Sequence, residues 1–134
     1  MKLEIKYKNP PNIGQIKSVL PIGRNNIFCY GNVLYVPSKV EVPQDIMCHE
    51  EVHARQQSVY SAPSFWWDKY LGDKEFRLSQ ELEAYARQLE FVKYNYTARG
   101  VKECLDELAN NLSTLYNLDI DFNKAKTMIR KFGK

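Results

Sequence analysis

Residues 49–53 read His-Glu-Glu-Val-His, and this stretch contains the only two histidines in the chain. The surrounding segment, Asp45 to about Ser58, has the pattern of a helix and follows a proline that suits a first turn. Side chains four residues apart lie on one face of a helix, one turn apart. His49 and His53 are therefore predicted to hold one metal ion together, with the Glu50 carboxylate beside it.

A histidine pair of this kind suits zinc. A catalytic Zn²⁺ takes three protein ligands, from histidine nitrogen and carboxylate oxygen, and keeps an open position. The ion acidifies a water molecule, and a nearby carboxylate takes the proton of that water. The motif thus predicts one Zn²⁺ per chain, bound by His49 and His53, with Glu50 as general base. The alternative is a chance match, with two solvated histidines on a surface helix.

The composition predicts one globular domain spanning residues 1–134. The chain is 44% apolar and 13% aromatic, which is enough for a single core. Its net charge of +3 is too small to indicate a nucleic-acid partner, because no basic stripe with interleaved aromatic residues accompanies it. The basic residues within 124–134 are expected to complement the dipole of a last helix. Contact with an acidic partner is the weaker alternative.

The cysteines and the N-terminal residues bear on the compartment. Cys29, Cys48 and Cys104 form no C-x-x-C pair, which indicates a reducing compartment rather than a disulfide framework. Residues 1–8 alternate apolar and charged side chains and lack an apolar signal core, and no segment approaches a membrane span. We therefore expect a cytoplasmic protein without membrane contact. The sequence leaves its oligomeric state open.

Strands are expected first and helices afterwards. Residues 1–8 predict a half-buried strand, and residues 27–36 predict a hairpin around Gly31-Asn32. After the motif helix, further helices are expected at residues 65–71, 74–96, beyond Gly100 and around 125–132. This order indicates the α+β class: a small N-terminal sheet, antiparallel or mixed, packed on a helical body.

The third metal ligand must be an aspartate, a glutamate or a cysteine, because the chain has no further histidine. The helix at 74–96 has an apolar stripe that marks its buried face, formed by Leu78, Leu82, Tyr85, Leu89 and Val92. At about 100° per residue, Glu81 lies about 60° from the middle of that stripe, whereas Glu83 lies about 140° away. The helix phase therefore favours Glu81. The alternative is that both glutamates are solvated and that Asp68, Asp73 or a water molecule completes the site.

With residues 49–53 and the E-x-x-A of residues 81–84, the chain resembles a small, minimal metallopeptidase of the gluzincin type. The similarity covers roughly residues 27–90, and compact zincins of this sort, some phage-encoded, carry a similar E-x-E-A-Y helix. The third histidine and the glycine of the metzincin pattern are absent, since those positions are Val59 and Gln56. The resemblance implies a zincin-like fold, a zinc-dependent peptidase and Glu81 as third ligand.

Some positions depart from the gluzincin pattern. Tyr85 stands where many gluzincins have an aspartate that supports a histidine, which makes its hydroxyl a candidate for that role. The oxyanion-stabilising histidine of larger gluzincins is missing, so a tyrosine or arginine would have to replace it. Arg77 is one candidate, with a pair to Glu81 or an ordinary surface position as alternatives. Trp66, Trp67 and Tyr70 would wall a substrate pocket or, more commonly, form core.

In zincins generally, an edge strand above the active-site helix pairs with the extended substrate. The best candidate for this substrate-binding strand is formed by Val33, Leu34, Tyr35 and Val36, because strand addition supplies backbone hydrogen bonds. The alternative is an ordinary edge strand that Pro37 protects.

The expected function is a zinc-dependent peptidase, an endopeptidase acting on a peptide or protein substrate. The alternative is a non-catalytic structural or binding module, for example a virion component, in which zinc only stabilises the zincin fold. Glu50 separates the two, because a purely structural site has no use for a general base. Nucleic-acid binding has only the basic residues near the C-terminal end in its favour.

Overall fold

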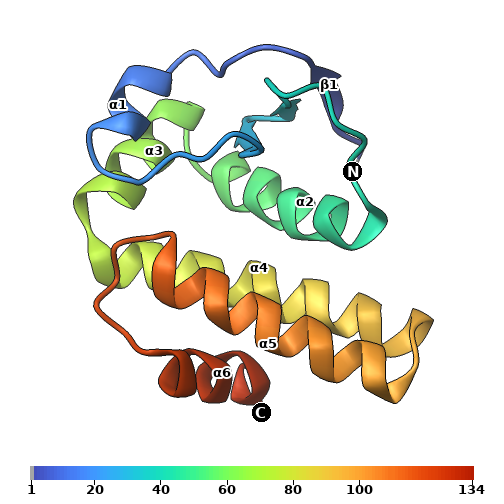
Figure 1. The fold of residues 1–134 in the computed structure, drawn as a ribbon. Coiled ribbons are helices and arrows are strands. Elements are labelled where there is room, and N and C mark those ends of the chain that lie inside the picture. The colour runs from blue at the N-terminus through green and yellow to red at the C-terminus, as the bar shows by residue number, and fades with distance from the viewer. Residues whose placement is uncertain (1) are drawn as a thin grey trace.

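A computed structural model describes residues 2–134 and shows an α+β architecture (Figure 1). The strands within that range are β1 (Glu4–Lys6), β2 (Phe28–Tyr30) and β3 (Val33–Tyr35). The helices are α1 (Ile13–Lys17), α2 (Gln44–Ser58), α3 (Pro63–Gly72), α4 (Lys74–Asn95), α5 (Ala98–Thr114) and α6 (Phe122–Lys131). The predicted class, a small mixed sheet with a helical body, is confirmed.

The β2–β3 hairpin forms around Gly31-Asn32, as predicted. Gly31 has a φ of +63°, in the left-handed region where residues with a Cβ are strained. Its antiparallel register pairs Cys29 with Leu34. β1 adds to the other side of β3, in parallel, with Ile5 opposite Leu34. The strand order is therefore β1-β3-β2.

This order makes β3 the central strand, so the expectation of an edge strand at residues 33–36 is wrong. Both sides of β3 are paired, and Leu34 and Val36 are fully buried. A substrate strand has no free edge on which to add to Val33, Leu34, Tyr35 or Val36. The parallel partner, β1, comes from a distant part of the sequence, and parallel pairing leaves no turn signal that marks its register.

The helices after the hairpin begin and end close to where the sequence predicts. Asp73, Thr97 and Asp121 cap α4, α5 and α6, and each side chain accepts a hydrogen bond from the backbone N–H three residues later. Such caps satisfy donors that the first turn leaves free. The five-residue α1 was not predicted, because so short a helix shows no periodicity. Among residues 2–134, no helix is long and apolar enough to cross a membrane.

Helix α2 lies between the sheet and the pair α4–α5 (Figure 1). On the sheet side, a cluster of buried residues joins β2 and β3 to Ala54 of α2, and consists of Leu3, Cys29, Leu34, Val36 and Ala54. A second cluster packs Trp66, Trp67 and Tyr70 of α3 against α1 and the sheet, and a third holds α4, α5 and α6 together. The histidine-bearing face of α2 consequently meets α4.

Candidate metal centre

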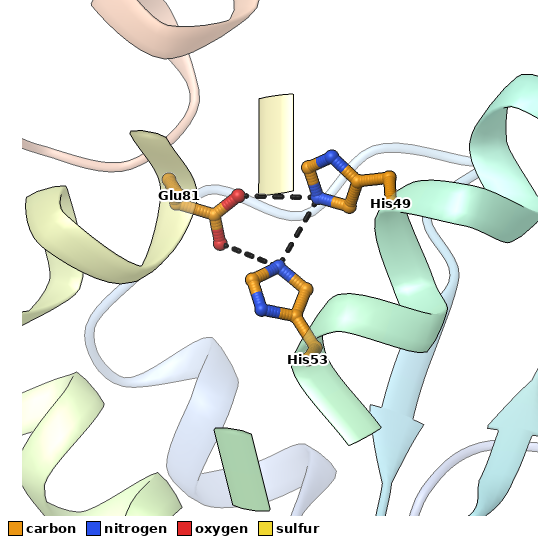
Figure 2. Close-up of side chains that lie close together, drawn as sticks. All are labelled: His49, His53 and Glu81. Carbon is orange, nitrogen blue, oxygen red and sulfur yellow. Dashed lines mark hydrogen bonds and ion pairs between the residues drawn. The ribbon is translucent and has the colours of Figure 1, made fainter. Parts of the chain in front are cut away.

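Three side chains from two helices converge between α2 and α4 (Figure 2). The Nε2 atom of His49 lies 3.2 Å from Oε1 of Glu81, and the Nε2 atom of His53 lies 3.1 Å from Oε2. The two Nε2 atoms lie 3.1 Å apart. The exposed fractions are 5% for each histidine and 2% for Glu81. The predicted histidine pair and the predicted third residue are thus brought into one buried group.

The geometry of this group fits a small tetrahedral cation. Ligand atoms bound about 2.0–2.1 Å from one tetrahedral ion are about 3.3–3.4 Å apart, close to the three separations of 3.1–3.2 Å. Within the described residues, Oε1 of Glu81, which faces Nε2 of His49, is buried without a hydrogen-bond partner. Leaving such atoms unsatisfied costs stability. Two imidazole nitrogens with a carboxylate are a donor set that zinc favours.

Gln56 orients one of the two rings. Its Oε1 lies 2.8 Å from Nδ1 of His53. Its Nε2 donates to the backbone oxygen of Gln80, at 3.1 Å, and to Oε1 of Glu83, at 2.7 Å. The amide oxygen therefore accepts from Nδ1, which leaves Nε2 of His53 directed at Glu81. Sequence reasoning missed Gln56, although its place three residues after His53 on the same helix face was the available signal.

Tyrosines support the other members of the group. The hydroxyl of Tyr70 donates to Oε2 of Glu81 at 2.5 Å, which links α3 to the carboxylate. Tyr85 places its ring edge-on against His49, with 4.5 Å between centroids. The Tyr85 hydroxyl pairs with that of Tyr116 at 2.6 Å. Tyr85 therefore packs against the histidine instead of hydrogen-bonding to it, so the expected hydroxyl support is wrong.

The group carries strong mutual electrostatics. Burial alone would raise the pKa of Glu81, but the positive charge of His53, its contact with the carboxylate and the nearby His49 imidazole hold that pKa well below its ordinary range. Burial alone would lower the pKa of His53, yet the Glu81 carboxylate raises it to about 9. A positive charge between these ligands is therefore favourable, whether a proton or a metal ion supplies it.

Glu50 lies beside the group without belonging to it. Its Oε1 is 4.0 Å from Nε2 of His49, and burial raises the pKa of its carboxyl. A cavity of about 80 Å³ exposes Glu50 together with His49, His53 and Glu81. Apolar residues line much of the rest of it, among them Ile16, Leu20, Ile22, Phe28, Trp66 and Trp67. Trp66, Trp67 and Tyr70 of α3 are thus both core and cavity wall.

A second cavity, of about 230 Å³, lies against the N-terminal half of α2. It also exposes His49 and Glu50, and its lining mixes polar residues, among them Asp45, Gln88 and Asn111, with apolar ones such as Ile46 and Leu108. The two cavities share several lining residues. The space around Glu50 therefore extends along α2 in both directions.

The other ligand candidates lie elsewhere. Asp68 accepts a hydrogen bond from Gln15 at 2.8 Å, and Asp73 caps α4, so neither completes the site. Glu83 is half-buried and bound to Gln56. The expectation that Glu83 is simply solvated is therefore wrong. The helix phase correctly placed the Cα atom of Glu83 away from the histidines. It did not predict that the long side chain of Glu83 reaches Gln56.

Arg77 has a different role from those expected. It is 1% exposed, and its guanidinium donates to the backbone oxygens of Tyr70, Leu71 and Tyr116. These contacts tie the C-terminal end of α3 to the segment after α5. Arg77 is therefore neither a surface residue nor paired with Glu81. Its place at the start of α4 lies next to buried backbone carbonyl groups, and these groups need hydrogen-bond donors.

Comparison with known protein families, with curated proteins and with solved structures finds no match to this chain. The resemblance to gluzincins consequently rests on residues 49–53 and 81–84. A functional assignment must be argued from the chemistry of the site.

Proposed function

We propose that the protein is a zinc-dependent peptidase in which His49, His53 and Glu81 hold one Zn²⁺ and Glu50 is the general base. The observation that carries the proposal is the position of Glu50. Its carboxylate is buried at the edge of a complete three-residue ligand group and opens into the same cavity. A metal used only for stability has no need of a second carboxylate that is not one of its ligands at that place.

The chemistry follows from the residues present. Zinc, when bound, acidifies a water molecule and polarises a carbonyl group. In the metal-free protein, burial raises the pKa of Glu50, and the carboxylate opens into the cavity where it can exchange a proton with a bound water molecule. Glu50 would take the proton of the attacking water and pass it to the leaving amine. Gln56 and Tyr70 would hold His53 and Glu81 in place during these steps.

The proposal places the substrate in the cavities along α2 and not on the sheet. β3 is paired on both sides. β2 lies at the sheet edge nearest α2, but the carbonyl of Cys29 already accepts hydrogen bonds from Gln57 and Trp67. Backbone addition to β2 is therefore obstructed at that residue. The apolar walls of the smaller cavity favour substrates with an apolar side chain next to the scissile bond.

A non-catalytic zinc module is the second candidate. The near-complete burial of the ligands and the small volume of the cavity around them favour it, because structural zinc sites are closed. It differs from the peptidase in one measurable respect. In a structural module, Glu50 contributes nothing that a substrate assay detects.

The deciding experiment loads purified protein with one equivalent of zinc and exposes it to a mixed peptide library, with cleavage read by mass spectrometry. The peptidase proposal expects cleavage by the parent, strongly reduced cleavage by Glu50→Gln and none by the metal-free parent. Zinc-loaded parent that leaves the library and folded protein substrates intact would support the structural module. Equal cleavage by Glu50→Gln would reject the proposed base.

A further inference from the structure

Glu83 and Glu81 both extend from α4 toward α2, but they engage different groups. Glu81 meets the histidines. Glu83 meets Gln56, whose Nε2 lies 2.7 Å from Oε1 of Glu83. Gln56 is 9% exposed and also contacts His53. The structure thus contains a continuous hydrogen-bonded path from Glu83 through Gln56 to the far side of the His53 ring.

The direction of this path follows from donor counting. A glutamine amide has one oxygen, which accepts, and one nitrogen with two N–H donors. Both donors of Gln56 are used, one by Glu83 and one by the backbone oxygen of Gln80. The amide oxygen must therefore face His53 Nδ1, which carries the proton. A neutral imidazole has one protonated nitrogen, so Nε2 is left free to bind a metal.

Removing the Glu83 carboxylate would leave the Gln80 oxygen as the one acceptor for Gln56 within the described contacts. The amide could then rotate by half a turn and present its N–H groups to His53. That arrangement favours the tautomer with the proton on Nε2, which is the nitrogen directed at Glu81. A hydrogen bond to an ionised acceptor is roughly twice as strong as a neutral one, so Glu83 is well suited to prevent this rotation.

We propose that Glu83 is a positioning residue: acting through Gln56, it holds His53 in the tautomer and orientation that bind the metal, and so sets the metal affinity of the site. The inference rests on the metal site of the proposed function. It does not depend on peptidase activity. The inference also changes what is expected of Glu83: from the helix phase alone, its substitution would leave the metal affinity unchanged.

The test measures Zn²⁺ affinity by competition with a chromophoric chelator, without substrate. Glu83→Leu removes the acceptor and is expected to weaken binding by about tenfold or more, the usual effect of losing a partner of a metal-bound histidine. Glu83→Gln keeps an acceptor oxygen and should stay near the parent. Glu90→Leu is the matched control, because Glu90 is an exposed glutamate of the same helix and its ion pair is with the exposed Arg87.

A double-mutant cycle separates positioning from a general structural effect. Gln56→Leu should weaken zinc binding at least as much as Glu83→Leu. If Glu83 acts through Gln56, adding Glu83→Leu to Gln56→Leu changes the affinity little further. Independent, additive losses would overturn the proposal. If Glu83→Leu does not fold, Glu83→Asp, which withdraws the carboxylate by one methylene, must weaken binding in the same direction.

A metal-free measurement keeps this proposal separate from the proposed function. In ¹⁵N-labelled apo protein, the Nδ1 proton of His53 should exchange slowly with solvent in the parent and faster in Glu83→Leu and Gln56→Leu. If the parent protein binds no zinc but the Nδ1 proton still exchanges slowly in the parent and faster in the two variants, the proposed function is refuted. The link from Glu83 through Gln56 to His53 would still stand. Identical exchange and identical zinc affinity in Glu83→Leu and Glu90→Leu would reject the role of Glu83.

Discussion

The Nε2 atoms of His49 and His53 lie 3.1 Å apart and face the same carboxylate. Two imidazole nitrogens at this distance can share one proton, or both can donate a lone pair to one cation. Helix α2 brings them together because four residues make about one turn. Glu81 then supplies the negative charge that makes a cation favourable at this place.

The protein is expected to bind one zinc ion per chain. At a free zinc concentration one hundred times the dissociation constant, binding should stabilise the fold by about 2.7 kcal/mol. For a chain of this size, that corresponds to a rise in the melting temperature on the order of 10 °C. Elemental analysis and thermal melts with and without a chelator check this. Metal-free protein whose melting temperature ignores added zinc would contradict it.

Glu50→Gln is expected to reduce peptide hydrolysis by about 10²–10⁴-fold, because the general base is lost. Zinc affinity should change little, since Glu50 is not one of the three grouped ligands. Activity and metal competition are measured on the same preparations. Glu51→Gln is the matched control: it makes the same charge change at the next position of α2, which lies outside the two cavities. A comparable loss in both variants would remove the argument for Glu50.

Glu81→Ala is expected to weaken zinc binding by well over tenfold, because one of three protein ligands disappears. Glu90→Ala, on the exposed side of the same helix, should leave the affinity unchanged. Glu83→Ala is not a silent control, given its contact with Gln56. A chelator competition titration ranks the variants. If Glu83→Ala proved more damaging than Glu81→Ala, the ligand assignment would have to move to Glu83.

The stability of the metal-free protein should fall between about pH 6.5 and pH 9. The folded chain raises the pKa of His53 from 6.5 to about 9, so it binds a proton that the unfolded chain has already released. The stabilisation is complete below the unfolded pKa and disappears as the pH rises through the folded one. Thermal melts across this range measure it. The lowered pKa of Glu81 acts oppositely: its stabilisation is present above pH 4.5 and declines in more acidic solution.

Two controls test this assignment. His53→Gln should flatten the decline between pH 6.5 and pH 9, because the titrating ring is gone. Saturating zinc should also flatten it, since a bound metal replaces the proton on the ring. An unchanged decline in His53→Gln would assign the pH dependence to another group.

Leu34→Ala tests the order of the sheet. Leu34 is fully buried in the central strand, whereas its parallel neighbour Ile5 is 39% exposed in an edge strand. Truncating a buried leucine typically costs about 2–5 kcal/mol, and Ile5→Ala should cost clearly less. Chemical denaturation of both variants gives the two values. Equal losses would argue against β3 as the middle strand.

Local signals in the sequence were sufficient for much of this protein. The helix beginning near residue 44 follows from the proline before it, and the helix beginning near residue 74 follows from its apolar stripe. The next helix was expected after Gly100 and begins slightly earlier, at Ala98. The hairpin at Gly31-Asn32 follows from turn chemistry. The pairing of His49 with His53 requires only helix geometry, and the phase of α4 was enough to select Glu81 over Glu83 as the residue that meets them.

Tertiary structure decided what depends on contacts between distant segments. β3 became the central strand because residues 4–6 pair with it across nearly thirty residues of chain, a choice that β-propensity does not encode. Arg77 is buried because the start of α4 packs next to the backbone carbonyl groups of Tyr70 and Tyr116, which accept its hydrogen bonds. The link from Glu83 through Gln56 to His53 likewise exists only once α2 and α4 are packed together. Periodicity reports which face of a helix is buried, but the partners that a long polar side chain reaches are settled only when the helices meet.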